Sequence, residues 1–252
     1  MSLLRIEGLC RNFGGLRAVC DLNAFVAPDE ITALIGPNGA GKTTAFNLVT
    51  GLLPVSSGRI MFGDEDITHA APYKIAKRGI ARTFQNIRIF HNMSALENVM
   101  VGLHAHTRKG FFSAALRFPG LAKEERFIRT EAMNHLDYVG LAHLAKQNAA
   151  GLSFGQQRIL EIARALATEP RLLLLDEPAA GLNSQETYKL GELIRRIRDR
   201  GITVFLVEHD MELVMSISDT IYVLNNGVLI ATGSPGNIQN NPEVIRAYLG
   251  EA

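Results

Sequence analysis

Several features are scarce in this sequence of 252 residues, and their scarcity limits the kinds of site and the cellular compartment that can be expected. It has two cysteines, Cys10 and Cys20, which fit neither the spacing of a metal site nor a disulfide framework. We therefore expect two reduced thiols in the core of a protein from a cytosolic compartment. The first residues, MSLLRIEGLC, lack the basic start and the apolar stretch of a signal peptide.

Long apolar runs and blocks of like charge are missing as well. No run approaches the ~20 apolar residues that a membrane-spanning helix needs, so any connection with a membrane has to come through a partner. The chain has 26 Lys and Arg against 25 Asp and Glu, a net charge of +1, which argues against a broad basic face for nucleic acid. With 47% hydrophobic residues it can build the core of one large domain or two small ones.

Strand and helix signals divide the chain into three parts. The first ~70 residues have mostly strand and turn character, with one helix predicted from about Lys42 to Leu52. Between residues 86 and 150 strand signals vanish and helical patterns replace them, which predicts a helical subdomain. A Gly/Phe/Pro-rich piece, RKGFFSAALRFPG, interrupts this part and is expected to be an inserted loop or short helix.

From residue 151 onward, predicted strands and helices alternate, as in a parallel sheet with crossover helices. The helix predicted over residues 185–199 has marked ends. Asn183 with Glu186 fits a capping box, and Gly201 fits the position after the last helical turn. Near the end of the chain, Asn226-Gly227 stands between two apolar runs and predicts a hairpin.

The stretch GPNGAGKTT matches the phosphate-binding pattern G-x-x-x-x-G-K-[ST], and it follows an apolar strand and precedes a helix as that pattern requires. Glycines let the backbone N–H groups turn toward phosphate oxygens, a lysine adds positive charge, and a threonine hydroxyl can reach Mg²⁺. A glycine-rich turn with an incidental lysine is the alternative, and the flanking strand and helix argue against it. The expected ATP-binding residues are Gly36, Pro37, Asn38, Gly39, Ala40, Gly41, Lys42, Thr43 and Thr44.

Polar residues follow three other predicted strands. Asp176 and Glu177 come directly after four leucines, and we expect Asp176 to hold Mg²⁺ through water and Glu177 to polarise an attacking water. Gln85 and His209 also leave strand ends, where Gln85 is expected to sense Mg²⁺ and water and His209 the γ-phosphate. A solvated turn or a surface cap is the ordinary alternative for each residue taken alone.

The stretch GLSFGQQRILEIARAL predicts an amphipathic helix, since Ile159, Ile162, Ala163 and Leu166 share one face. Its start, Ser153 to Gln157, has the small polar residues of an anion site at a helix N-terminus. The chain would thus carry a second phosphate site.

Taken together, the motifs resemble those of the nucleotide-binding subunit of ABC transporters, in order and spacing and over essentially the whole chain. The resemblance implies an α/β fold: a P-loop NTPase (RecA-like) core with an N-terminal antiparallel β-subdomain, formed by residues 1–85 and 151–252. Residues 86–150 would be the inserted α-helical subdomain, with the signature motif at 152–157. The stretches that carry the resemblance are Gly36–Thr44, Gln85, Ser153–Gln157, Leu172–Glu177 and His209.

This family works as a head-to-tail dimer with two ATP molecules between the subunits. The resemblance therefore implies that Ser153, Phe154, Gly155 and Gln156 contact the ATP of the opposite subunit. Phe154 replaces a glycine of that motif and is expected to face away from the phosphate and pack on the helical subdomain. The resemblance also places Phe13 on the adenine ring; a core strand residue is the alternative.

Finer features resemble the LivG-type ATPases of branched-chain amino acid importers; they include ARTFQNIRIF, LDEPAAGLN, VEHDMELVMSISD and NNPEVIRAYLGEA. Such importers contain a second, LivF-like ATPase, two membrane permease subunits and an extracytoplasmic binding protein. The chain would then sit in the cytoplasm at the inner face of the membrane and hydrolyse ATP, with Glu177, His209, Lys42 and Gln85 as catalytic residues. Urea-importer and lipopolysaccharide-export ATPases are similar enough to remain alternatives.

Two further functions belong to other classes. A soluble ABC ATPase of translation or DNA repair usually has two such domains or a long coiled-coil insertion, and this chain has one P-loop and no heptad run. A non-catalytic ATP-binding subunit would gate its partner without hydrolysis. The complete set of Lys42, Asp176, Glu177 and His209 argues against it.

Overall fold

The computed structural model describes residues 2–104 and 121–249, and it divides into two compact units. One unit is formed by Met1–Gln85 and Arg171–Ala252, the other by Asn86–Pro170. The helical unit thus continues past the boundary expected at residue 150, because α5 (Phe154–Leu166) shares one apolar core with α3 (Ala95–Leu103) and α4 (Leu121–Tyr138). The piece from 108 to 120, which is rich in glycine and phenylalanine, lies outside the described residues, so its predicted form stays a prediction.

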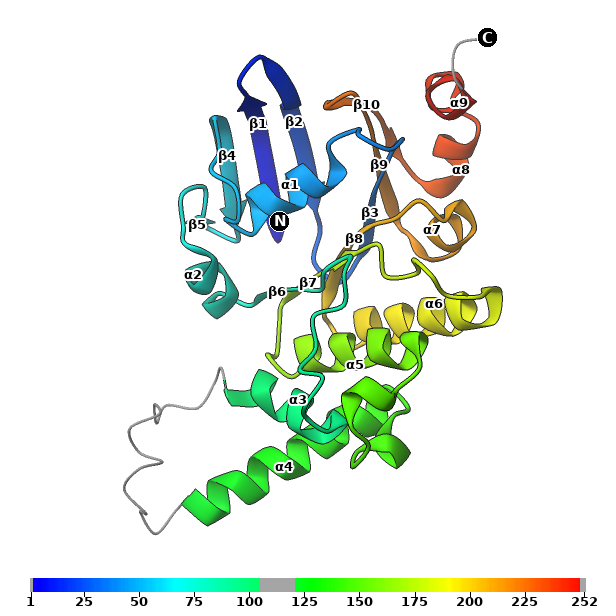
Figure 1. Ribbon diagram of the computed structural model, residues 1–252. Coiled ribbons are helices and arrows are strands. Elements are labelled where there is room, and N and C mark those ends of the chain that lie inside the picture. Colours follow the sequence, from blue (N-terminus) through cyan, green and yellow to red (C-terminus); the bar gives the residue numbers. More distant parts are fainter. Residues whose placement is uncertain (1, 105–120, 250–252) are drawn as a thin grey trace. The chain divides into compact units, whose positions relative to one another are not determined.

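The larger unit contains two sheets (Figure 1). Its six-stranded sheet has the order β10-β9-β3-β8-β7-β6, and β9, β3, β8, β7 and β6 are parallel. The central strands are buried at every position because they are covered on both faces. The strands are β3 (Ile31–Ile35), β6 (Ile80–Arg82), β7 (Leu172–Asp176), β8 (Thr203–Val207), β9 (Thr220–Asn225) and β10 (Val228–Gly233).

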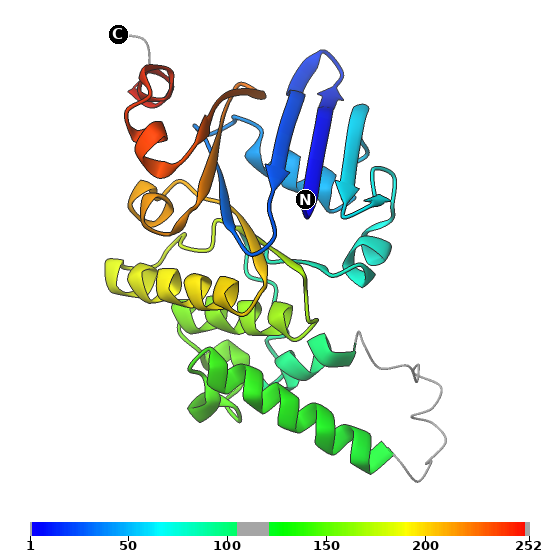
Figure 2. The same ribbon diagram turned by 180° about the vertical axis from the view of Figure 1, so that it is seen from behind.

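The second sheet is antiparallel, with the order β2-β1-β4-β5 (Figure 2). Helix α1 (Lys42–Val49) joins the two sheets, because its Phe46 lies in one core with residues from both and meets Phe205 edge to face, with ring centroids 4.9 Å apart. The strands are β1 (Leu4–Phe13), β2 (Leu16–Val26), β4 (Ser57–Phe62) and β5 (Glu65–Asp66). The predicted combination of an antiparallel β-subdomain with a P-loop core is confirmed.

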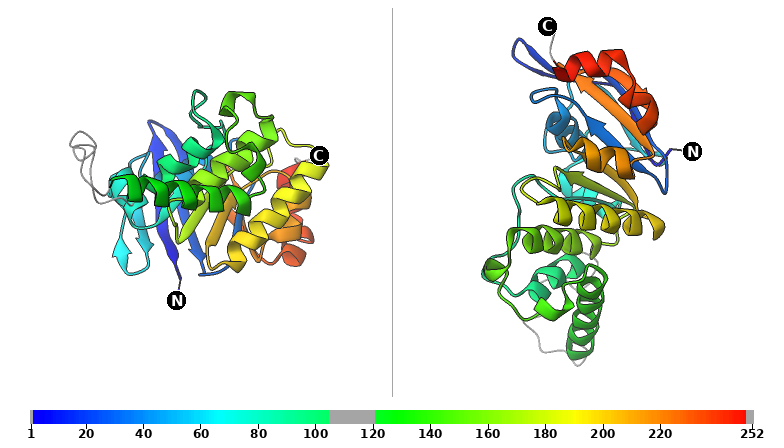
Figure 3. Two further views of the ribbon diagram at one scale, coloured as in Figure 1. Left: turned by 90° about the horizontal axis from the view of Figure 1, so that it is seen from below. Right: turned by 90° about the vertical axis from the view of Figure 1, so that its right-hand side faces the viewer.

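Several local predictions are confirmed by the remaining elements. Helix α6 begins with the expected capping box, in which Asn183 and Glu186 exchange hydrogen bonds. Asn226 and Gly227 both have positive φ and join β9 to β10 as a tight hairpin. The C-terminal helices lie beside β10 (Figure 3). The other helices of this unit are α2 (Pro72–Lys77), α6 (Ser184–Asp199), α7 (Met211–Ile217), α8 (Pro235–Gln239) and α9 (Pro242–Leu249).

The helical unit adds two short 3₁₀ turns, Ala142–Leu144 and Ala149–Gly151, to its three helices. Its core gathers apolar faces from α3, α4 and α5, among them Val99, Leu136 and Leu160. No helix within residues 2–104 and 121–249 is long and apolar enough to cross a membrane.

The position of the cysteines differs from the expectation. Cys10 and Cys20 are free, as expected, but both are half-buried and not part of the core. Side chains alternate along a strand, and the neighbouring Leu9 takes the core position on β1, so Cys10 faces away from it.

Candidate active site

The P-loop lies between the carboxyl end of β3 and the start of α1. Gly36, Gly39 and Gly41 have φ values of 149°, 82° and 99°, in the region that favours glycine. A Cβ atom on Gly41 would come within 2.4 Å of the backbone oxygen of Ala18 on β2, so glycine is also required there for close packing. The loop can therefore turn its N–H groups inward only because these residues lack side chains.

The N-terminus of α1 is open to an anion. No side chain in the described part of the chain caps it, whereas α3, α5 and α6 each begin with a complete capping box. Lys42, in the first turn, is buried and donates from Nζ to the carbonyl oxygens of Gly36 (2.6 Å) and Pro37 (2.9 Å). The pKa of Lys42 is lowered overall because the side chain is buried, although the carboxylates of Glu177 and Asp176 act to raise it. This combination of free N–H groups and a cation suits a phosphate chain.

Asp176 ends β7 with its side chain buried against Arg82 of β6. The Nη2 of Arg82 lies 2.7 Å from Oδ2 of Asp176, and the two side chains are 6% and 3% exposed. The Nη1 of Arg82 donates to Asn47 (2.8 Å) and Thr50 (3.0 Å) of the α1 region. The other carboxylate oxygen, Oδ1, is buried without a hydrogen-bond partner among the described residues, as expected of an atom that holds a metal ion through water.

Two of the predicted residues, Gln85 and His209, lie at one carboxylate oxygen of a third, Glu177. The Nε2 of Gln85 donates to its Oε2 at 2.8 Å, and the Nδ1 of His209 lies 3.9 Å from the same atom. These side chains come from the ends of β6, β7 and β8, which reach the same edge of the parallel sheet. Glu177 has a φ of 47°, which is uncommon for a residue with a side chain.

Across the described residues no group of three His, Cys, Asp or Glu side chains could hold a metal by itself. The ligands expected at this edge are instead a hydroxyl, an amide and a carboxylate, from Thr43, Gln85 and Asp176. Such hard oxygen donors suit Mg²⁺, which usually keeps waters and phosphate oxygens among its ligands. The residues present therefore fit a magnesium–nucleotide complex.

The second predicted phosphate site lies in the helical unit, at the start of α5. Ser153 Oγ accepts from the N–H of Gln156 (3.3 Å), and Gln156 Oε1 accepts from the N–H of Ser153 (2.9 Å). The first N–H groups of a helix have no acceptor within the helix, so those of Phe154 and Gly155, which the capping box does not use, are the donors that can meet an anion. Phe154 is 49% exposed and contacts Arg158 of its own helix, with 5.8 Å from guanidinium to ring. Phe154 is therefore not part of the apolar core of the helical unit, and its packing on the surface of that unit stays a prediction.

Phe13 stands at the end of β1 with 43% of its surface exposed. The guanidinium of Arg11 lies 4.5 Å from the centre of its ring. The alternative of a core strand residue is wrong, and the exposed part of the side chain can be reached by a ligand.

Two residues of this site were not foreseen. Arg82 stands three residues before Gln85 and pairs with Asp176, as described above. Glu208 stands directly before His209, fully buried, with its carboxylate on backbone N–H groups. In both cases the sequence signal is a charged residue at the end of an apolar strand.

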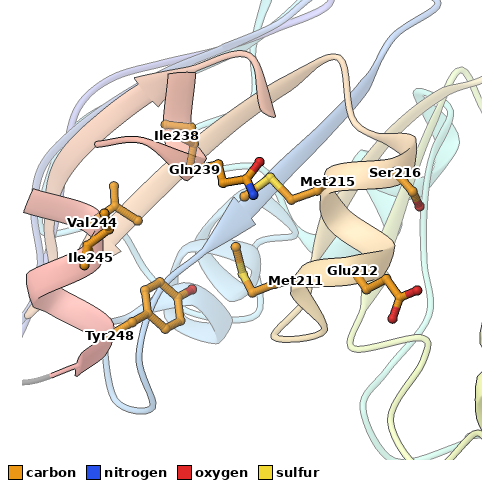
Figure 4. A pocket seen from close by; sticks show the side chains of 9 residues that line it. All are labelled: Met211, Glu212, Met215, Ser216, Ile238, Gln239, Val244, Ile245 and Tyr248. Carbon is orange, nitrogen blue, oxygen red and sulfur yellow. The ribbon is translucent and has the colours of Figure 1, made fainter. Parts of the chain in front are cut away.

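A separate groove of about 710 Å³ lies between α7 and the C-terminal helices (Figure 4). Its lining is mainly apolar, with Met211, Met215, Ile238 and Val244. Tyr248 at its edge has a backbone hydrogen bond with Gly36, although burial raises the pKa of its hydroxyl overall. The described lining includes none of the predicted site residues, but Tyr248 brings the edge of the groove next to Gly36 of the P-loop.

Comparison with known proteins identifies the family. A family model described as "ABC transporter" matches residues 19–180, more than half of the chain. The chain belongs to the ABC transporter ATPases. A second model, "Branched-chain amino acid ATP-binding cassette transporter", matches residues 228–252.

Curated relatives place this ABC ATPase in the LivG/BraF branch. It is 47% identical to the high-affinity branched-chain amino acid transport ATP-binding protein LivG of Escherichia coli (strain K12), over 99% of this chain and 98% of the relative. BraF of Pseudomonas aeruginosa has the same identity and coverage. The predicted family, its branch and its ATPase activity are confirmed.

Two solved structures of ATP-binding cassettes from ABC transporters confirm the fold. A nucleotide-free cassette has a TM-score of 0.86 at 33% identity, and one in its ADP conformation has 0.87 at 33%; in each case both chains are covered completely. The chain is therefore an ATP-binding subunit that works with further transporter subunits.

Proposed function

We propose that this ATPase couples ATP binding and hydrolysis to the uptake of leucine, isoleucine and valine through partner membrane subunits. The observation that carries the proposal is the 47% identity, over nearly the full length, to proteins named for high-affinity branched-chain amino acid transport. The C-terminal match over residues 228–252 supports the same substrate class. If the substrate test below fails, the alternatives are the ATPase of a urea importer or that of a lipopolysaccharide exporter.

Deleting the gene is expected to abolish high-affinity uptake of all three branched-chain amino acids, because the membrane subunits lose their energy source. Uptake of radiolabelled leucine, isoleucine and valine at low concentration measures this. Restoring the wild-type gene should restore uptake, and restoring the Lys42→Ala variant should not. Unchanged uptake in the deletion strain would exclude the substrate class without affecting the ATPase assignment.

The assembly that we propose is a head-to-tail dimer, with a LivF-like ATPase or a second copy of this chain. Each nucleotide would then contact the P-loop of one subunit and Ser153, Phe154, Gly155 and Gln156 of the other. The start of α5 supports this arrangement, since its capping box uses neither the N–H of Phe154 nor that of Gly155, and helix N-termini favour phosphate. Two permease subunits and an extracytoplasmic binding protein complete the importer, with this chain at the cytoplasmic face of the membrane.

In the catalytic step Glu177 takes a proton from the attacking water, and Gln85 and His209 position the reactants beside it. Lys42 stabilises negative charge that develops on the transferred phosphoryl group. Thr43, Gln85 and Asp176 would hold Mg²⁺, which neutralises phosphate charge when bound. The convergence of Gln85 and His209 on one oxygen of Glu177 supports these roles.

Nucleotide-driven closure would reach the membrane subunits through Gln85 and the segment that follows it. We propose residues 86–100 as the surface that receives a cytoplasmic helix of a permease. Phe90 and Met93 in this segment are partly exposed apolar side chains, which suits an apolar partner.

Stacking of Phe13 on adenine has a direct test. Phe13→Ala is expected to weaken ATP binding about tenfold, because base–aromatic stacking contributes about 1–3 kcal/mol. Phe13→Tyr should bind normally. Phe25→Ala removes a comparably exposed phenylalanine from β2 and serves as the matched control. Equal affinities for Phe13→Ala and Phe25→Ala, measured with a fluorescent ATP analogue, would contradict the stacking role.

A further inference from the structure

Glu208 is a buried carboxylate with an unusual set of partners. It follows β8 directly, and none of its surface is exposed. Its Oε1 accepts from the N–H of Ala179 at 2.7 Å, and its Oε2 accepts from those of His209 (3.0 Å) and Asp210 (3.4 Å). A single side chain thus joins the turn after β7 to the segment that carries His209.

The turn after β7 is the one that contains Glu177. It is attached to β8 at two points: the N–H of Glu177 donates to the carbonyl of Val207 at 2.9 Å, and the N–H of Ala179 donates to Glu208. A further bond closes the turn, from the N–H of Ala180 to the carbonyl of Glu177 at 3.2 Å. The left-handed backbone of Glu177 persists only while these surroundings hold it, because such a conformation is unfavourable by itself.

The charge of Glu208 explains why a carboxylate, and not an amide, suits these N–H partners. The pKa of Glu208 is raised overall because the side chain is buried. The hydrogen bonds from the N–H groups of Ala179, His209 and Asp210 act in the opposite direction and lower it. A carboxylate is acceptor-only and can satisfy N–H groups on both oxygens, whereas the amide of glutamine would turn an NH₂ group toward one of them. The side chain therefore requires the turn and the His209 segment to stay at a fixed spacing.

We propose that Glu208 is a positioning residue for ATP hydrolysis: it ties the turn that carries Glu177 to the segment that carries His209 and so keeps the two side chains aligned. The inference rests on the proposed role of Glu177 as general base. Glu208 does not touch the nucleotide in this scheme, so its effect is on the rate of the chemical step and not on ATP affinity.

Steady-state Mg-ATPase assays on the full-length protein test the proposal. Glu208→Gln is expected to lower kcat about 10- to 100-fold while KM stays within about twofold, since small displacements of catalytic groups have effects of this size. ATP-bound dimers should accumulate in this variant because binding is intact. Glu212→Gln removes the same charge from an exposed position four residues further on, and should behave as wild type.

Folding is monitored by thermal unfolding of each variant. If Glu208→Gln does not fold, Glu208→Asp keeps the charge with a side chain too short to reach both partners, and a reduced kcat at unchanged KM is expected for it. The inference is wrong if the folded variant has the wild-type kcat, or if KM rises while kcat is kept. Glu177→Gln, assayed in parallel, separates the two proposals: a wild-type rate for Glu208→Gln beside an inactive Glu177→Gln overturns only the role of Glu208, whereas an active Glu177→Gln overturns the general base itself.

Discussion

Glu177→Gln is expected to abolish ATP turnover while ATP binding is kept. The amide cannot take a proton from water, and loss of a general base usually lowers a rate by about 10²–10⁴-fold. The substitution is nearly isosteric, so the turn at the end of β7 should keep its hydrogen bonds to Val207 and Ala180. Phosphate release measures the turnover, and gel filtration with Mg-ATP detects the dimer that accumulates when hydrolysis stops.

The same experiment separates a base from a neighbour that merely lies close. His209 and Gln85 also contact the Glu177 carboxylate, so their replacement should lower turnover without the complete loss expected for Glu177. Normal turnover in Glu177→Gln would remove Glu177 as the base. The chain would then need a different group to activate water at this sheet edge.

Arg82→Ala is expected to destabilise the larger unit by about 3–5 kcal/mol, because it leaves the carboxylate of Asp176 buried without its counter-charge. Part of this loss comes from the hydrogen bonds that Arg82 donates to Asn47 and Thr50. Urea unfolding of the nucleotide-free protein measures the free energy of unfolding. Arg82→Lys keeps a charge but cannot reach all three partners, so it should fall between wild type and Arg82→Ala.

A matched control comes from the same unit of the protein. Arg78 pairs with Glu65 through a similar guanidinium–carboxylate contact, but both side chains reach solvent. Exposed pairs contribute about 0–1 kcal/mol, so Arg78→Ala should change the free energy of unfolding little. Similar losses for Arg78→Ala and Arg82→Ala would show that burial of the Arg82–Asp176 pair is not what makes it important.

The P-loop and the polar residues at the strand ends could be located from the sequence because each has a local signature. The glycines and lysine of the P-loop have the spacing that binding a phosphate chain requires, and Asp176 and Glu177 follow an apolar run that has the length of a buried strand. The hairpin at Asn226-Gly227 and the cap at Asn183 are equally local, since two to four residues determine them. Such features depend on backbone conformation within a few residues and not on the rest of the chain.

Long-range pairings could not be predicted in the same way. Arg82 and Asp176 are 94 residues apart, and Glu208 and Ala179 are 29 apart, so only the order of strands in the sheet brings them together. The end of the helical unit was placed too early for the same reason. The apolar face of α5 was evident in the sequence, but not that this face packs on α3 and α4.

The left-handed backbone at Glu177 affects which substitutions would be favoured at this position during evolution. Glycine would adopt this conformation more easily than any residue with a side chain, by about 1–2 kcal/mol. A glycine there would favour folding and remove the carboxylate that we propose as the general base. With Glu177 as the proposed base, stability and activity make opposite demands at this position, and selection for stability alone would favour its replacement by glycine.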